Sequence, residues 1–180
     1  MHEIETKILN VNPRVVAAKL KKLGAKQTLK TRLVVDWFGP KGLTHAGDDP
    51  WFLRVRTGAG KTEITWKAHS KILGASRSHK EINVAASSHE QACAILAALG
   101  LENYAHQEKD RVSWTLKRWK FDLDKYPKMP SYLEIESSSE QNIQKAIALL
   151  GLTGHRALPE GERTLIQREY KLDWCEMRFK

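Results

Sequence analysis

Residues 3–7 read EIETK, and the alternation of charge within this short stretch decides the fold. Successive side chains of a β-strand point to opposite faces, so Glu3, Glu5 and Lys7 would share one face and Ile4 and Thr6 the other. The charged face either meets water or lines a polar interior. The remaining strands of the chain distinguish these two possibilities.

Five further segments repeat the alternation of charged and apolar residues. The residues in phase are Arg54 and Arg56 in FLRVR, Glu63 and Lys67 in EITWK, Lys109 and Arg111 in KDR, Arg118, Lys120, Asp122 and Asp124 in RWKFDLD, and Glu134 and Glu136 in YLEIE. An antiparallel sheet with one solvated face would explain any single strand. It explains the set less well, because solvated faces usually mix Thr, Ser, Gln and Lys. Here arginine and lysine gather on some strands and paired carboxylates on others.

Closure of the sheet into a barrel would bring these faces together around one cavity that carries both signs of charge. Carboxylate pairs offer the hard oxygen ligands that Mg²⁺ or Mn²⁺ prefers, while arginine and lysine bind phosphate oxygens. Buried charges must be paired or bound to ions, so a metal and a polyphosphate would also relieve repulsion inside the barrel. The alternation therefore favours a cavity for a metal-bound polyphosphate.

Three segments place a capped helix and a Leu-Gly pair after a glutamate-bearing strand. Asn12 precedes the first helix, which ends at Gly24; Ser88 and Gln91 have capping-box spacing in the second, which ends at Gly100. The third, SSSEQNIQKAIALLGL, repeats the opening and ending of the second. Near the end of the chain, helical spacing predicts a last amphipathic helix that includes Ile166, Tyr170, Trp174 and Met177.

The composition fits one α+β domain. With 180 residues, the chain is long enough for a real core and too short for two ordinary domains. We expect a single domain over residues 1–180, with motifs in 1–152 and a C-terminal extension in 153–180. Apolar runs are too short to span a bilayer and the start lacks a secretory signal, so we expect a cytoplasmic protein without membrane contact. The net charge of +9 indicates an anionic partner.

Two apparent motifs carry little weight. Cys93 and Cys175 lie far apart, without CxxC spacing or a companion histidine cluster, which argues against a disulfide framework or a zinc site. Cys93 is expected in the core beneath a helix. GAGKT at residues 58–62 looks like the end of a phosphate loop, but the required glycine is replaced by Val55 and the segment joins two strands. A hairpin turn is the better interpretation.

The ordered set of motifs resembles the signature of the CYTH proteins, also called triphosphate tunnel metalloenzymes. EIETK is similar to their N-terminal ExExK, and the match continues with the RxR of FLRVR, the lysine of TWK, the glutamate of HKE, the KxR of KDR, Asp124 of DLD and the closing ExE of YLEIE. DWF, and LEIES before a helix that ends in LGL, look most like the branch with class IV adenylyl cyclases. The resemblance covers roughly residues 1–152, and the ordered set is more specific than any single motif.

The resemblance implies a closed eight-stranded antiparallel β-barrel with helices packed outside, Mg²⁺ or Mn²⁺ as cofactor, and reaction at a triphosphate. The implied metal ligands are Glu3, Glu5, Asp124, Glu134 and Glu136. The implied substrate-binding residues are Lys7, Arg54, Arg56, Lys67, Lys109 and Arg111, with Glu81 in support. Within these sets, Glu5, Lys7, Lys67 and Arg111 are the expected catalytic residues. Two positions on the middle strand depart from the family pattern, because His79 stands where an arginine often precedes Glu81, and Asn83 follows where an acid is expected.

We expect hydrolysis of inorganic triphosphate or of a nucleoside or thiamine triphosphate, because this needs only the metal and the basic residues. Cyclisation of ATP to cyclic AMP and pyrophosphate is the alternative, and it also needs an adenine pocket. A protein that binds polyphosphate without turnover ranks lower. A nucleic-acid-binding module ranks lower too, since the aromatic residues are mostly out of phase with the charges. The expected oligomeric state is a monomer or homodimer.

Overall fold

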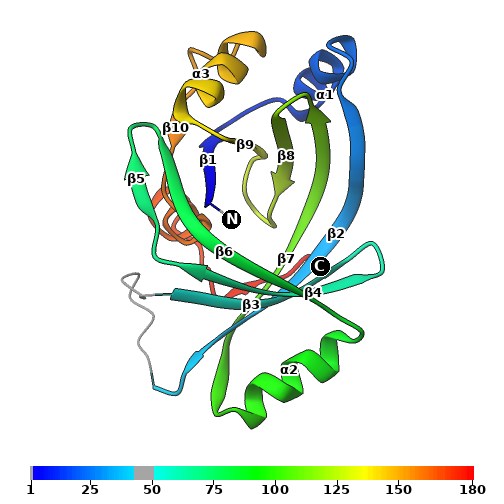
Figure 1. Cartoon of the computed structure of the whole chain (residues 1–180), viewed down its shortest axis with the longest axis vertical. Helices are drawn as coiled ribbons and strands as arrows, with labels where there is room; N and C mark the ends of the chain where they lie inside the picture. Colours follow the sequence, from blue (N-terminus) through cyan, green and yellow to red (C-terminus); the bar gives the residue numbers. More distant parts are fainter. Residues whose placement is uncertain (1, 43–50) are drawn as a thin grey trace.

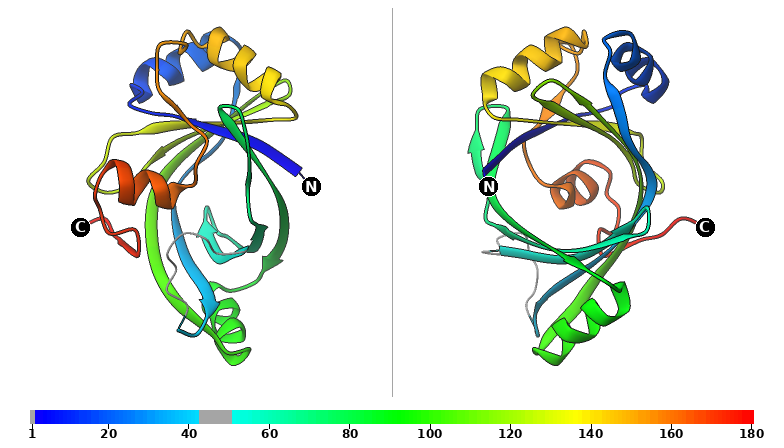
Figure 2. Two further views of the ribbon diagram at one scale, coloured as in Figure 1. Left: turned by 90° about the vertical axis from the view of Figure 1, so that its left-hand side faces the viewer. Right: turned by 45° about the vertical axis from the view of Figure 1, so that its right-hand side comes forward.

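The computed structural model describes residues 2–42 and 51–180, apart from the side chains of His2 and Glu3. Within these residues, eight strands form a closed ring in which every neighbouring pair is antiparallel (Figures 1 and 2). In order around the ring they are β1 (His2–Ile8), β9 (Tyr132–Ser137), β8 (Trp119–Lys125), β7 (Leu101–Leu116), β2 (Lys26–Pro40), β3 (Trp51–Gly58), β4 (Lys61–Ala68) and β6 (Ser76–Ala86). The ring confirms the predicted eight-stranded barrel.

The ring closes at β1, the strand that contains EIETK. Glu5 is the register partner of Glu136 on β9 and of Arg77 on β6. β1 therefore pairs with β9 on one side and with β6 on the other, and these two pairings close the ring. Three short strands extend the sheet at its margins: β5 (Lys71–Leu73) on β6, β10 (Ala157–Leu158) on β1, and β11 (Glu176–Met177), which runs parallel to β7. The sequence patterns did not indicate these three.

Three helices stand outside the barrel, as predicted. They are α1 (Pro13–Lys22), α2 (His89–Ala98) and α3 (Glu140–Leu149). The side chains of Asn12, Ser88 and Ser139 accept hydrogen bonds from backbone N–H groups of their first turns, which is the capping that the sequence indicated. Figure 1 shows α1 and α3 together at one end of the barrel and α2 at the opposite end.

The last helix is shorter than its sequence pattern predicts. α4 (Glu162–Thr164) continues directly into η1 (Leu165–Glu169), and the chain then turns through Lys171, whose φ is 55°. Trp174 therefore lies beyond the helix and Met177 lies in β11, yet both are buried in the same core as Ile166. Helical spacing correctly predicted that these residues face the core. It does not distinguish a helix from a segment that folds back over one apolar surface.

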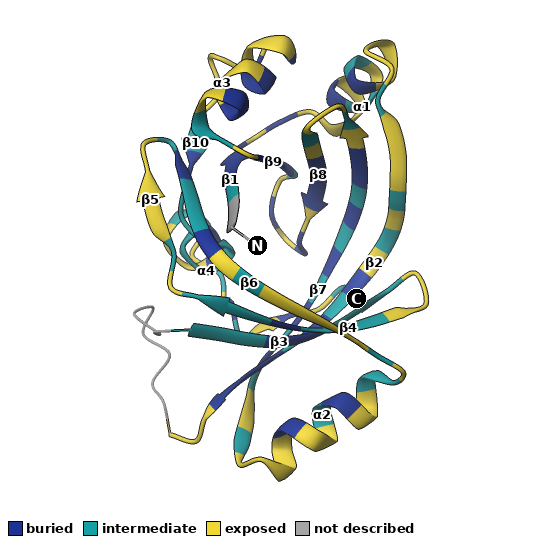
Figure 3. Cartoon of the chain, in the orientation of Figure 1, coloured by how far each residue is buried: buried dark blue, intermediate teal, exposed yellow. Residues whose placement is uncertain are grey.

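The C-terminal segment is part of the barrel's packing. Leu158, Leu165 and Trp174 share one buried cluster with Val35 and Trp37 of β2. In the right-hand view of Figure 2, α4 and η1 lie within the outline of the ring of strands. Figure 3 shows β8 and β9 buried along most of their length, whereas buried residues alternate with half-buried ones along much of β7. These contacts favour the single domain expected over residues 1–180, which stays a prediction.

Candidate functional site

The charged strand faces converge on one cavity inside the barrel, which holds about 840 Å³ of space including its open ends. Of the residues singled out in the sequence, the cavity is lined by Glu5, Arg54, Arg56, Lys67, Glu81, Lys109, Arg111, Glu134 and Glu136. Lys7 and Asp124 lie directly behind this lining, each in contact with Glu134 or Arg111. The side chain of Glu3 lies outside the described residues.

Three carboxylates form an acidic group on one side of the cavity. Asp124, Glu134 and Glu162 each offer an oxygen within 4.8 Å of the other two. The ammonium of Lys109 contacts both Asp124, at 2.9 Å, and Glu162. Carboxylate oxygens this close repel one another unless a cation lies among them.

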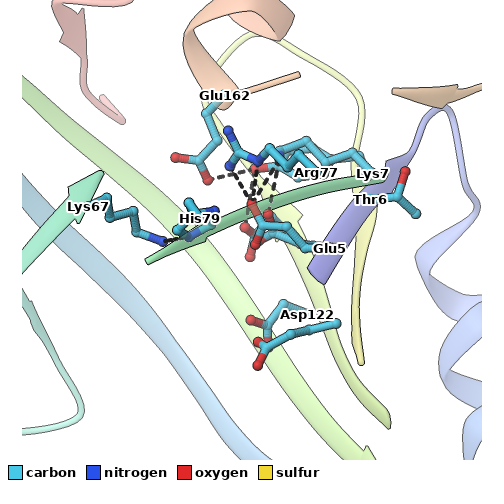
Figure 4. Close-up of polar contacts among 12 residues, drawn as sticks. Glu5, Thr6, Lys7, Lys67, Arg77, His79, Asp122 and Glu162 are labelled. Carbon is cyan, nitrogen blue, oxygen red and sulfur yellow. Dashed lines mark hydrogen bonds and ion pairs between the residues drawn. The ribbon is translucent and has the colours of Figure 1, made fainter. Parts of the chain in front are cut away.

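Glu162 belongs to α4 and was not singled out in the sequence. Figure 4 shows it reaching into the site from the C-terminal segment. The hydroxyls of Tyr126 and Tyr132 donate hydrogen bonds to it at 2.9 and 3.0 Å, and burial and its negative charge raise the pKa of both tyrosines well above the ordinary value. Burial opposes the ionisation of Glu162, but Lys109 lowers its pKa, so the carboxylate is charged.

Arg111 is the centre of the acidic side. Its guanidinium donates to Asp124 Oδ1 at 2.6 Å and to Glu134 Oε2 at 3.0 Å, and its third nitrogen lies 2.7 Å from Asp122 Oδ2. Burial alone would lower the pKa of Arg111, but Asp122 and Asp124 raise it well above the ordinary value. This guanidinium therefore holds three carboxylates from β8 and β9 in fixed positions.

Lys7 is fully buried beside Glu134 and one further carboxylate, Glu5. Its Nζ lies 3.1 Å from Glu134 Oε1 and 3.8 Å from Glu5 Oε1. Burial disfavours the charged form of Glu134, yet Lys7 and Arg111 lower its pKa well below the ordinary value. The lysine of EIETK thus positions a carboxylate of the closing EIE motif across the β1–β9 pair.

Arg77 on β6 is the second residue that the sequence motifs missed. Its Nε donates to Glu5 Oε1 at 2.7 Å, and Figure 4 shows the two side chains directed at one another. Burial raises the pKa of Glu5, but the positive charges of Arg77, Lys7 and Lys67 together lower it to about 2. A signal was present, because Arg77, His79 and Glu81 are in phase on one strand face and all line the cavity. The guanidinium sits two residues before His79.

The strand that departs from the family pattern contributes a compact polar group. Lys67 Nζ contacts Glu81 and lies 3.2 Å from His79 Nε2, and Asn83 donates to the other oxygen of Glu81 at 2.8 Å. Burial and the neighbouring Arg54 lower the pKa of Lys67. His79 therefore occupies a place within the cavity wall, while Asn83 orients Glu81.

Two arginines of β3 form the basic side of the cavity. The side chain of Arg56 donates to Glu63 at 2.8 Å, and the positive charge of Arg54, together with burial, lowers the pKa of Arg56. Arg54 itself is only 6% exposed. Its guanidinium lies 5.5 Å from the ring centroid of Trp37, and within the described part of the chain its Nε has no hydrogen-bond acceptor. A buried guanidinium without an acceptor is costly, so this side of the cavity favours an anion.

Glu136 lies nearer to solvent than the other predicted ligands. Its side chain is 26% exposed, and Lys120 donates to it at 2.9 Å. In the described residues, neither Glu5 nor Glu136 belongs to the group of three closely spaced carboxylates. The carboxylates expected from the ExE motifs thus occupy different depths along the same wall.

The family model for the CYTH domain matches residues 1–170. Protein PH1012 of Pyrococcus horikoshii is similar in structure at 24% identity and a TM-score of 0.74, covering 88% of this chain and 96% of that one. A Vibrio parahaemolyticus protein described as an adenylate cyclase candidate has 14% identity and a TM-score of 0.65, with 100% and 94% covered. Hippeastrum HpAC1, described as an adenylyl cyclase candidate with a dominant triphosphatase activity, has 13% identity and a TM-score of 0.66, with 98% and 99% covered. At these identities the likeness shows the fold.

No curated protein sequence matches the chain. In the described residues, the helices are all too short or too polar to cross a bilayer.

Proposed function

The chain belongs to the CYTH domain family, and from this premise we propose that it is a divalent-metal-dependent enzyme that hydrolyses a triphosphate inside its barrel. The observation that supports this most is the pairing of two unlike walls in one cavity. One wall gathers carboxylates within 4.8 Å of one another, and the other presents Arg54, whose Nε has no acceptor among the described residues. A metal-bound polyphosphate has a cation for the first wall and anionic oxygens for the second.

The donor set on the acidic wall fits Mg²⁺ or Mn²⁺. Asp124, Glu134 and Glu162 supply only carboxylate oxygens, which are the ligands that these hard cations prefer. Lys109 and Arg111 already contact this group, which shows that its negative charge is stabilised by neighbouring cations. We retain Glu3, Glu5 and Glu136 as further proposed ligands. When bound, the metal would neutralise phosphate charge and favour attack at phosphorus.

The basic wall would bind the phosphate chain. Arg54 and Arg56 offer fork-shaped donors that match phosphate oxygens, and Lys67 adds a compact positive charge. Because these side chains are fixed by Trp37, Glu63 and Glu81, they would stabilise the charge that develops during phosphoryl transfer with little reorganisation. Lys7 would act behind the surface by holding Glu134 in place. Water entering through the open ends of the cavity is the proposed nucleophile.

The direct test is product analysis with purified protein, Mg²⁺ or Mn²⁺, and tripolyphosphate, ATP or thiamine triphosphate as separate substrates. We expect orthophosphate to appear only with metal, and Arg54→Met to abolish most of it. Arg32→Met is the matched control, since Arg32 is exposed and pairs with Asp110 on the outside of the barrel. Equal, metal-independent phosphate release by the wild type and by Arg54→Met would refute the proposal.

Cyclisation of ATP is the second candidate, and the aromatic end of the cavity favours it. Trp37, Phe52 and Trp174 line the cavity beside Arg54, with Trp37 and Trp174 ring centroids 5.2 Å apart. Such a wall suits an adenine or another organic ring next to the phosphates. Cyclic AMP with pyrophosphate from ATP would identify this reaction, whereas ADP with orthophosphate would identify hydrolysis.

We also carry forward two expectations from the sequence. The chain is proposed to act as a monomer or homodimer, which light scattering at several protein concentrations would measure. Its proposed cytoplasmic location would be tested by fractionation of the source cells. Both are independent of which triphosphate is the substrate.

A further inference from the structure

A second cluster of metal-binding side-chain types lies outside the barrel, between its wall and α2. Asp36 on β2 is the register partner of Val55 on β3, and Val55 packs in one cluster with Ala92 and Leu96 of α2. The face that carries Asp36 is therefore the one that α2 covers. None of the residues in this cluster lines the cavity inside the barrel.

Three unlike donors converge in this cluster. One donor atom each from Asp36, His89 and Cys93 lies within 4.8 Å of the other two. His89 Nε2 is 2.7 Å from Asp36 Oδ2. Cys93 follows His89 by four residues, so both side chains leave the same face of α2 one turn apart. A pair of ligands at this spacing on one helix is a common way to hold a metal.

The other polar atom of Asp36 and that of His89 form hydrogen bonds with residues outside this cluster. Asp36 Oδ1 accepts a hydrogen bond from Asn103 Nδ2 at 3.0 Å and lies 2.9 Å from His106 Nδ1. His89 Nδ1 lies 2.8 Å from Thr57 Oγ1. Metal-ligating histidines and carboxylates are typically oriented in this way by hydrogen bonds to their other polar atom. The arrangement leaves Oδ2, Nε2 and the thiol facing one another.

We propose that Asp36, His89 and Cys93 form a Zn²⁺ site with a fourth position open to solvent. A donor set of one nitrogen, one sulfur and one oxygen suits zinc, whereas Mg²⁺ and Mn²⁺ prefer oxygen alone. Zinc bonds of about 2.0–2.3 Å require ligand atoms roughly 3.3–3.8 Å apart, so side-chain shifts of about 1 Å complete the site. His89 is 26% exposed, which gives the ion and a water ligand a route in. Binding displaces the thiol proton to solvent.

The sequence argued against zinc because the cysteines lack a companion histidine cluster. A histidine does stand four residues before Cys93, and the fold supplies the third donor, since β2 brings Asp36 to a helix whose residues lie more than fifty positions later in the chain. The competing interpretation is a hydrogen-bonded network that only fastens the first turn of α2 to the barrel. That network would have no specific affinity for zinc.

The test uses the full chain, stripped of metal by a chelator and then titrated with Zn²⁺ or Co²⁺ in excess Mg²⁺. We expect one equivalent to bind, with sulfur-to-cobalt charge-transfer absorption. Cys93→Ser should lose this absorption and weaken zinc binding by at least roughly 100-fold, whereas Cys175→Ser, which removes the only other thiol, should match the wild type. Asn103→Ala, which removes a donor to Asp36, should weaken binding by roughly 10–100-fold.

Absence of sulfur-to-cobalt absorption in the wild type would overturn the proposal, whatever the stability of the variants. Zinc binding by Cys93→Ser with unchanged affinity would also overturn it. Triphosphate turnover should be the same in Cys93→Ser and the wild type, so the outcome is separate from that of the proposed function.

Discussion

The two walls of the cavity differ in how their buried positive charges are paired. On the wall formed by β1, β7, β8 and β9, the cations Lys7 and Arg111 each contact at least two carboxylates. On β3, Arg54 is equally buried but lies against the ring of Trp37, and in the described part of the chain its Nε has no acceptor. The difference teaches that the acidic wall is organised by its own ion pairs, whereas we propose that an anion from outside completes the basic wall at Arg54.

Removing Arg111 should break the acidic wall. Arg111→Met leaves Asp122, Asp124 and Glu134 without their shared guanidinium, and breaking a buried pair in this way typically costs about 3–5 kcal/mol of unfolding free energy. Urea denaturation measures the loss. Arg32→Met removes an exposed ion pair and should cost less than about 1 kcal/mol. Equal stability of the two variants would mean that the buried network does not organise this wall.

Removing Arg54 should have the opposite effect, with little loss of stability and a large loss of turnover. Arg54→Met breaks no carboxylate ion pair of the described residues, so the unfolding free energy should change by less than about 1 kcal/mol. Triphosphate turnover should nevertheless fall roughly 10²–10³-fold, as for the loss of one well-placed donor to developing charge. Steady-state kinetics with Mg²⁺ and urea denaturation of the same preparation test both halves. A variant that is severely destabilised but fully active per folded molecule would contradict the assignment of this wall.

Acid should weaken the acidic wall through Glu5. Its pKa is lowered from 4.5 to about 2, so its stabilising effect is complete above pH 4.5 and is lost as pH falls through about 2. The stability difference between the wild type and Glu5→Gln should therefore shrink by on the order of 3 kcal/mol between pH 5 and pH 2. Urea denaturation across this range provides the measurement. A difference that does not vary with pH would show that the ion pair with Arg77 does not stabilise the fold.

A substitution outside both walls, in the cap of α1, should have a small effect on stability and none on turnover. Asn12→Ala removes the side chain that caps α1 and should cost about 1 kcal/mol of stability. Turnover by the folded enzyme should not change, because α1 lies outside the barrel. A marked loss of turnover would mean that the end helices are coupled to the cavity.

The sequence predicted those parts of the molecule that depend on short-range pattern. Charge alternation on single strands identified the faces that line the barrel, since the two-residue period of a strand is a local property. The caps at Asn12 and Ser88 were visible for the same reason, because a cap and its acceptor lie within one turn. Barrel closure followed only when all the charged faces were considered together.

The residues that were missed depend on contacts between distant segments. Glu162 lies in the short helix α4, outside the strands with alternating charge, and only the path of the C-terminal segment brings it beside Asp124. Arg77 was in phase with Glu81, but its partner Glu5 lies 72 residues away across the closure of the barrel. Asp36 and Cys93 meet for a similar reason, through the packing of α2 on the barrel wall. Spacing within a motif carries no information about such pairs.

The most direct test of the division between the two walls is a crystal structure with Mn²⁺ and tripolyphosphate bound. Anomalous scattering locates manganese independently of the phosphate. We predict a manganese peak among Asp124, Glu134 and Glu162, with phosphate oxygens on the guanidinium of Arg54. Manganese and tripolyphosphate bound elsewhere than the cavity, or phosphate oxygens far from Arg54, would contradict the account.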